Sequence, residues 1–281
     1  MADPLPLLSN QPKLGIIAGG GDLPKRIARA CQEKSRDFYI LAIKGQTNLE
    51  TVQNVSHDWI QPGAIGKGIK LLKENSVQEL IMVGYYKRPS WKELRLDLVG
   101  AKWLAKFVYK IGNDDGILRL IVQEFENEGF DVIGVDKILG GKEMAPEGVI
   151  GKHKPSKEDW VSINRGFEVL TVLGKVDIGQ SIVVQEGTVV GIEAMEGTDQ
   201  LMIRCQGLHP AGSGAILIKM AKPFQDTRVD MPVIGVKTIE TAVRSGIKGI
   251  AVQSGHVIIL EPEKVSALAD KAGIFLIGVS Q

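Results

Sequence analysis

The chain has 281 residues, of which 44% are hydrophobic and 24% charged, and its formal net charge is +1. This length accommodates one large or two medium domains, each with its own core. The near-neutral charge and the aromatic share of 5% disfavour both a basic nucleic-acid-binding surface and stacking platforms for single strands.

Targeting signals and cysteine usage suggest a compartment. The N-terminal stretch MADPLPLLSNQPK lacks the basic segment and apolar run of a signal peptide, and no stretch of about 18 apolar residues occurs. Cys31 and Cys205 form no CxxC pair and are expected to be reduced thiols. The sequence therefore predicts a soluble, cytoplasmic protein.

In the first half, apolar runs alternate with amphipathic segments. LGIIAG, FYILAI, ELIMVG and DVIGV are predicted strands, and a loop containing Gln46 and Thr47 follows the second. Helices are predicted at 25–33, 66–74 and 117–128, with a mixed-charge helical region at 91–109. This alternation predicts a Rossmann-like α/β domain with a parallel sheet over residues 1–137.

The amino-acid composition changes after that domain. Residues 138–156, rich in Gly, Pro and Lys, are predicted to connect it to a second α/β domain, residues 157–281, with a mixed sheet. A helix is predicted at 157–173, followed by SIVVQ and TVVGIEAM joined by a tight turn at Glu186-Gly187. The remaining predicted strands are LMIRC, AILIKM, VIGV, GIAVQ, VIILE and IFLIGV, with helices near 238–245 and 262–272.

A glycine-rich turn between the first strand and helix is the first candidate ligand site. It comprises Gly19, Gly20, Gly21, Asp22, Leu23 and Pro24. Glycines admit close backbone approach and a helix N-terminus favours an anion, so the turn is typical of phosphate or nucleotide binding. Pro24 replaces the third glycine of GxGxxG, which disfavours a nicotinamide site. A purely structural tight turn remains an alternative.

Polar clusters follow two later strands. Gly66 and Lys67 lie in GAIGK, and Lys87 and Arg88 lie in GYYKRP, where carboxyl ends of strands open into a ligand crevice. The alternative is that each lysine is simply solvated. Asp114 and Asp115 precede a helix, which they either cap or equip with a hard-cation or ribose site.

In the second half, the segment EAMEGTD gathers acidic residues at a strand end. Its candidate ligand-binding residues are Glu193, Gly197, Thr198 and Asp199, together with the nearby Arg204. A turn followed by a helix cap would also explain them. The structural and functional interpretations are equally supported.

The segment AKPFQDTRVDMP interrupts two apolar runs with charges. Lys219, Lys222 and Arg228 supply cationic donors for phosphoryl oxygens. Asp226 and Asp230 are oxygen ligands of the type that Mg²⁺ prefers. A salt-bridged surface loop is the alternative. From the residues alone, the prediction is a two-domain phosphate-handling protein.

Taken together, these segments resemble a known family. LGIIAGGGDLP, GAIGK, IMVGYYKRP, GNDDGIL, VVQEGTVVGIEAMEGTD and KMAKPFQDTRVDMPVIGVKT resemble the two-domain UDP-2,3-diacylglucosamine pyrophosphatases of the lipid A pathway, in the family's order. The resemblance implies Mg²⁺-dependent hydrolysis to UMP and 2,3-diacylglucosamine 1-phosphate (lipid X), with water attacking the sugar-side phosphorus.

The resemblance also implies residue roles. QDTRVD, which begins at Gln225, matches the family's QDxRxD, so Asp226 is expected to be the catalytic metal ligand, with Asp230 the second choice. Lys222 and Arg228 would neutralise phosphoryl oxygens, and the glycine turn and Gly66-Lys67 would hold the UMP part. Tyr85 and Tyr86 depart from the family's small or aliphatic residues.

The resemblance also implies a location: the enzyme would visit the cytoplasmic face of the inner membrane transiently. No nucleic-acid partner is expected from the composition, and a homodimer through the second domain is a further hypothesis. The alternative function is a non-catalytic nucleotide-sugar or phosphate-binding protein. It would bind UMP or UDP-sugars without turnover.

Overall fold

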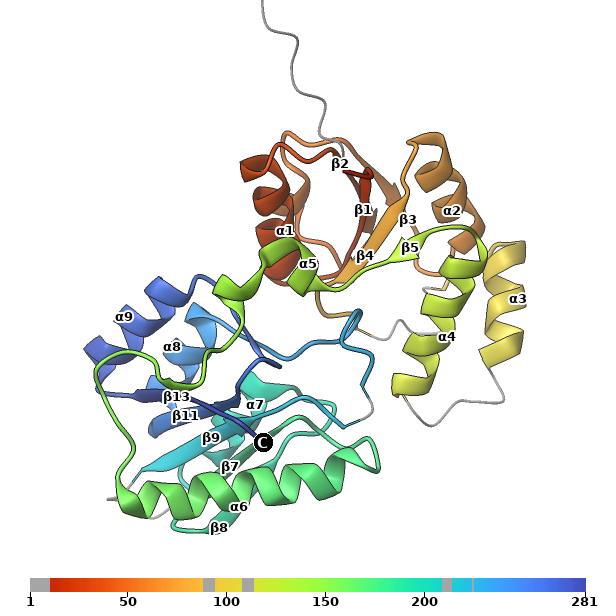
Figure 1. The fold of residues 1–281 in the computed structure, drawn as a ribbon. Coiled ribbons are helices and arrows are strands. Elements are labelled where there is room, and N and C mark those ends of the chain that lie inside the picture. The colour runs from red at the N-terminus through yellow and green to blue at the C-terminus, as the bar shows by residue number, and fades with distance from the viewer. Residues whose placement is uncertain (1–10, 88–93, 108–113, 209–213, 224) are drawn as a thin grey trace, which may run out of the picture. The chain divides into compact units, whose positions relative to one another are not determined.

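The computed structural model describes residues 11–281 except 88–93, 108–113, 209–213 and 224 (Figure 1). The chain divides into two compact units, Met1–Leu139 and Gly140–Gln281. The first contains a parallel sheet and the second a mixed sheet, which confirms the predicted fold class of two α/β domains. No helix in the described ranges has the length and apolar character needed to cross a membrane.

The sheet of unit 1 has the strand order β3-β2-β1-β4-β5, and all of its pairs are parallel. Its strands are β1 (Leu14–Ala18), β2 (Phe38–Ile43), β3 (His57–Ile60), β4 (Glu79–Val83) and β5 (Asp131–Val132). The sequence analysis missed β3, because its HDWI sequence buries only Ile60 and carries no apolar run. Strand order reverses between β1 and β4, so their carboxyl ends form the topological switch point.

Helices cover the two faces of this sheet (Figure 1). They are α1 (Leu23–Glu33), α2 (Ile65–Glu74), α3 (Leu98–Phe107), α4 (Asp114–Asn127) and α5 (Val135–Leu139), with a short 3₁₀ helix η1 (Leu49–Val52) after β2. Helix α1 packs against α5, and α2 packs against α3. Helix α1 buries Ile27, Ala28, Ala30 and Cys31, the apolar face that its periodicity predicts.

The main sheet of unit 2 has the order β6-β13-β11-β9-β7-β8. Its strands are β6 (Gly148–Val149), β7 (Ser181–Gln185), β8 (Thr188–Ile192), β9 (Ala215–Lys219), β11 (Ile247–Gln253) and β13 (Phe275–Val279), and β10 (Val233–Ile234) pairs separately with β12 (Ile258–Ile259). Strands β9, β11 and β13 are parallel, whereas β7 is antiparallel to both β8 and β9. Consequently β8 and β9 end at the same edge of the sheet.

Both faces of this sheet carry a hydrophobic core. Helix α6 (Lys157–Gly174) covers one face with Ile163, Phe167 and Leu170. Helices α7 (Thr198–Cys205), α8 (Val236–Arg244) and α9 (Pro262–Ala272) contribute to the core on the other face. Helix α6 begins with a capping box in which Ser156 and Asp159 exchange hydrogen bonds.

One segment of unit 2 differs from its predicted structure, and the predicted connection contributes elements of its own. LMIRC, predicted as a strand, belongs to helix α7, because Leu201, Met202 and Cys205 are buried at helical spacing. The predicted connection, 138–156, contains the boundary between the units. It also contributes a 3₁₀ helix η3 (Gly141–Glu143), the core residue Ala145 and strand β6 to unit 2.

Candidate functional site

The glycine turn of unit 1 is tied to the loop after β4. Gly20 N–H donates to the Tyr85 carbonyl at 2.8 Å, and Tyr85 N–H donates back at 3.0 Å. A Cβ at Gly19 would lie 2.6 Å from the Tyr85 oxygen, so glycine is needed for this close backbone approach. The first two glycines therefore serve strand-to-loop packing, which was the structural alternative for this turn.

Backbone N–H groups without an acceptor among the described residues lie at the start of α1. Asp22 occupies the N-cap position without a side-chain cap, and Pro24 lies in the first turn. Within the described ranges, no acceptor is found for the N–H groups of Gly21, Asp22 and Leu23. This end of α1 is the part of the glycine turn that can receive an anion.

The turn at the start of α2 is occupied by the protein's own carboxylate. Asp97 accepts hydrogen bonds from Lys67 N–H at 3.0 Å and from Gly100 N–H at 2.8 Å. Burial disfavours the charged form, but backbone donors including Gly66 and Val99 outweigh it and hold the pKa of Asp97 below its ordinary value. The backbone N–H groups of Gly66 and Lys67 therefore donate to Asp97 rather than to a ligand. The exposed Lys67 ammonium is the group that remains for a ligand.

Gln46 bridges the loops after β2 and β4. Its side-chain amide donates to the Lys87 carbonyl at 2.9 Å and accepts from Lys87 N–H at 3.0 Å. Because β2 and β4 flank β1, this bridge spans the carboxyl end of β1. Gln46 was not among the predicted site residues. The Lys87 side chain is exposed.

Some predicted site residues of unit 1 cannot be placed. Arg88 lies outside the described residues. Asp114 and Asp115 begin α4, where the backbone is described but their side chains are not. Their predicted roles stay predictions.

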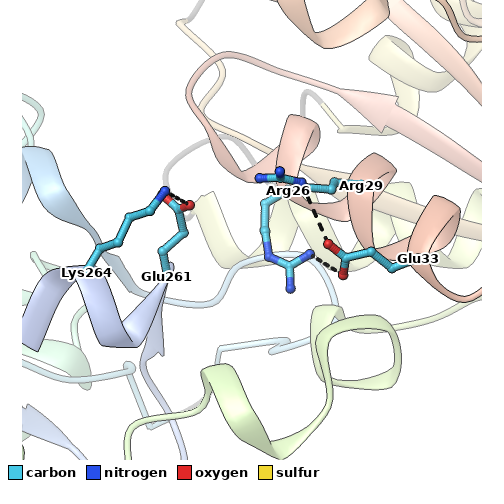
Figure 2. Close-up of polar contacts among 5 residues, drawn as sticks. All are labelled: Arg26, Arg29, Glu33, Glu261 and Lys264. Atoms are coloured by element: carbon cyan, nitrogen blue, oxygen red, sulfur yellow. Dashed lines mark hydrogen bonds and ion pairs between the residues drawn. The ribbon is translucent and has the colours of Figure 1, made fainter.

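Charge pairs lie on the surface of helices in both units. Figure 2 shows Glu33 held by two arginines of its own helix, at 3.5 Å from Arg26 and 3.7 Å from Arg29. The same figure shows Lys264 paired with Glu261, the residue that precedes α9. Pairs of this exposed kind contribute little to stability.

In unit 2, a buried lysine lies at the edge where β8 and β9 end. Lys219, the last residue of β9, is 2% exposed. Its ammonium donates to the Thr198 hydroxyl at 2.7 Å and to the Ser181 hydroxyl at 3.1 Å. Burial lowers the pKa of Lys219, and the nearby carboxylates of Glu193, Asp230 and Asp199 oppose that shift.

Glu193 completes this network. It follows β8 and is 6% exposed, and its N–H donates to the Ser181 carbonyl at 2.9 Å. One carboxylate oxygen, Oε1, accepts from the Thr198 hydroxyl at 3.2 Å. The other, Oε2, is buried without a hydrogen-bond partner among the described residues. Sequence analysis predicted Glu193, Thr198 and Lys219 but missed Ser181, whose only signal is its place at the start of a strand.

The loop that follows β9 is held by its own side chains. Asp226 accepts from Arg228 at 2.7 Å and 3.0 Å, and also from the Arg228 backbone N–H at 3.1 Å. Asp230 accepts from the Gln225 side chain, whose oxygen in turn accepts from Lys222 N–H at 3.0 Å. This arrangement places both aspartates on one folded loop beside the end of β9.

Two more of the predicted cationic side chains already form ion pairs within the protein. The Lys222 ammonium pairs with Asp177, a residue that sequence analysis missed. Arg204 pairs with Glu196 at 2.9 Å. At the start of α7, Gly197 occupies the N-cap position with φ +81°, and Asp199 pairs with Lys237 at 2.9 Å. These contacts are also compatible with the turn-and-cap alternative.

The carboxylates of unit 2 do not gather into a closed metal site within the described residues. Among the residues that the structure describes, no group of three His, Cys, Asp or Glu side chains could hold a metal ion. Mg²⁺ is commonly bound by one or two carboxylates, with water and substrate phosphate completing its shell. A site made entirely of protein ligands is not formed by the described residues, and Asp226 and Asp230 stay predicted ligands of an open site.

Comparison with known proteins covers almost all of the chain. The LpxI N-terminal domain matches residues 13–141, and the LpxI C-terminal domain matches residues 146–277. The chain is 36% identical over 274 residues to UDP-2,3-diacylglucosamine pyrophosphatase LpxI of Caulobacter vibrioides, covering 95% of this chain and 97% of that protein. These matches confirm the resemblance seen in the sequence motifs, and the chain belongs to the LpxI family.

Proposed function

We propose that this protein hydrolyses the pyrophosphate bond of UDP-2,3-diacylglucosamine, giving UMP and 2,3-diacylglucosamine 1-phosphate. The observation that carries the proposal is full-length similarity to a relative named for this activity, at 36% identity. The folded loop bearing Asp226 and Asp230, beside the buried Lys219, supports it. Hydrolysis of a pyrophosphate requires positioned cations and water rather than a covalent nucleophile.

In unit 2, Asp226 and Asp230 would hold Mg²⁺. When bound, the ion would neutralise charge on the phosphoryl oxygens. Arg228 already contacts Asp226 through its guanidinium, and its side chain is 42% exposed, so it can also reach a phosphoryl oxygen. Lys222, engaged with Asp177, would fix the base of the loop.

In unit 1, the N-terminal end of α1 would receive the phosphate of the UMP part. Its donors are the N–H groups of Gly21, Asp22 and Leu23. The exposed ammonium groups of Lys67 and Lys87 would add positive charge at the same edge of the sheet. Arg88 stays a predicted contributor here.

Product analysis tests this proposal. Purified protein would be incubated with UDP-2,3-diacylglucosamine in ¹⁸O-labelled water, with Mg²⁺ or with EDTA, and the products identified by mass spectrometry. We expect Mg²⁺-dependent release of UMP and lipid X, with the label in lipid X if water attacks the sugar-side phosphorus. Tight binding without turnover would contradict hydrolysis and favour the non-catalytic nucleotide-sugar-binding alternative. Label in UMP would keep the enzyme and move the attack to the other phosphorus.

We also propose transient contact with the cytoplasmic face of the inner membrane, because the substrate carries two acyl chains. Co-sedimentation with phospholipid vesicles, with and without substrate, would measure it. Retention of all protein in the supernatant under both conditions would contradict it. Sedimentation equilibrium would test the predicted homodimer separately.

A further inference from the structure

We infer that Glu193 is a further catalytic residue, whose unpartnered oxygen accepts the proton of the attacking water while Lys219, acting through the Thr198 hydroxyl, holds the carboxylate in place. The inference rests on the proposed hydrolysis. It adds a residue and a role to the loop of Asp226 and Asp230.

The first observation is the unpartnered oxygen. Glu193 is 6% exposed, yet only Oε1 has a hydrogen-bond partner in the described structure, the Thr198 hydroxyl. A buried carboxylate oxygen without a donor is costly, and such groups are rare in folded proteins. An oxygen of this kind is suited to a donor that arrives with the substrate, such as a water or a hydroxyl.

The second observation is the direction of the hydrogen bonds. A hydroxyl has one proton to donate, and the Thr198 proton is directed to Glu193. Ser181 lies 3.1 Å from Thr198 and must therefore be the donor in that contact, while it accepts from the Lys219 ammonium. Every donor in the network thus leads from Lys219 toward Glu193, which fixes the carboxylate through Oε1 and leaves Oε2 without a donor among the described residues.

The third observation is position. Ser181 pairs with Lys219 across the neighbouring strands β7 and β9, and Glu193 follows β8 at the same edge of the sheet. The loop that carries Asp226 and Asp230 begins just beyond Lys219. Asp230 is near enough to influence the Lys219 ammonium electrostatically. Glu193 therefore lies at the sheet edge where this loop begins, and both Glu193 and Asp230 act on the Lys219 ammonium.

The proposed step is an attack of water on one phosphorus of the pyrophosphate. The water oxygen forms a bond to one phosphorus, and the bond from that phosphorus to the bridging oxygen breaks. The bridging oxygen leaves with the other phosphate and its electron pair. One water proton passes to Glu193 Oε2 and is then released to solvent. Proton transfer of this kind contributes about 10²- to 10⁴-fold to a rate.

Glu193→Gln tests the catalytic role, because glutamine keeps an acceptor for Thr198 but is not a base. We expect kcat to fall at least about 100-fold while KM changes less than about threefold. Glu196→Gln is the matched control, since Glu196 lies on the same turn and pairs with Arg204 at the surface. Its kcat should stay within about threefold of the unaltered protein. Retention of more than half of kcat in Glu193→Gln would overturn the inference.

Thr198→Ser and Thr198→Val test whether Lys219 acts through the hydroxyl. Serine keeps the hydroxyl, so its kcat should stay within about threefold of that of the unaltered protein. Valine should lower kcat about tenfold or more without raising KM. The kcat and KM values of Lys219→Arg and Lys219→Met would be compared in the same way. Thermal unfolding of each variant would also be measured. Equal kcat in the serine and valine variants would contradict the positioning role even if the lysine variants unfold. Failure of the unaltered protein to turn over would instead reject the proposed function.

Discussion

The two units present carboxyl ends of parallel strands at one edge of a sheet, but they equip those edges differently. In unit 1, backbone groups line the edge: Gly20 pairs with Tyr85, Asp97 receives donors at the start of α2, and the first N–H groups of α1 have no acceptor among the described residues. In unit 2, ionisable side chains meet at the edge, with the buried Lys219 linked to Glu193 through a hydroxyl.

This difference separates two ways to handle a charged ligand. An edge with free helix N–H groups binds an anion without changing its protonation. An edge with buried acids and a buried cation can move protons and neutralise developing charge. We therefore expect ligand binding in unit 1 and catalysis in unit 2, and four predictions test this expectation.

The largest effect is expected at Asp226. Asp226→Asn should lower kcat about 10³-fold, because it weakens both the proposed metal site and the fixed charge beside the phosphoryl group. Steady-state hydrolysis at saturating Mg²⁺ measures it, and the unfolding free energy should change little. The matched control is Asp97→Asn in unit 1. Equal losses of kcat in the two variants would break the comparison between the units.

Gly84 should show the largest stability effect in unit 1. Its φ is +95°, and an added Cβ would lie 2.5 Å from the Gly20 carbonyl oxygen. We expect Gly84→Ala to cost about 2–4 kcal/mol of unfolding free energy, from backbone strain and steric overlap together. Gly45→Ala is the control, since φ is +76° but no atom lies within 4 Å, and it should cost about 1 kcal/mol. Equal costs in denaturant unfolding would show that the Gly84–Gly20 approach contributes nothing.

Asp97→Ala should cost about 2 kcal/mol, since one carboxylate caps the starts of both α2 and α3. The pKa of Asp97 is lowered in the folded protein, so its contribution is present above its unfolded pKa of about 3.9 and is lost as pH falls through the folded value. The difference in unfolding free energy between the two proteins should therefore shrink below about pH 4. Denaturant titrations at pH 7 and pH 3 measure this. A difference that is independent of pH would contradict the capping role.

The smallest effect concerns the cysteines, one in each unit. Burial raises the pKa of Cys31 to about 11 and also raises that of Cys205, so native labelling by a thiol reagent at pH 8 should be very slow. Asp97→Ala should speed labelling of Cys31 through local opening of unit 1 and leave Cys205 unchanged. Mass spectrometry of the labelled peptides separates the two sites. Faster labelling of both would show that the units do not open independently.

Much of the fold was predictable from sequence because it depends on local pattern. The runs LGIIAG, FYILAI and AILIKM are buried strands, as their apolar continuity predicts. The strand β3 and the helix α7 were not predicted. HDWI carries no apolar run. LMIRC is a short apolar segment in which only the burial of Leu201, Met202 and Cys205 on one face identifies a helix.

The sequence by itself determined the two α/β domains, the residue types of the charged loop and the motifs that place the chain in the LpxI family. Only the tertiary structure decided which groups are already engaged, such as Asp97 at the start of α2 and Lys222 with Asp177. It also brought Ser181, Thr198 and Lys219 together from separate segments and left Glu193 Oε2 without a partner. Hydrogen bonding and burial depend on which segments contact one another in the folded protein. The spacing of residues along the chain does not specify those contacts.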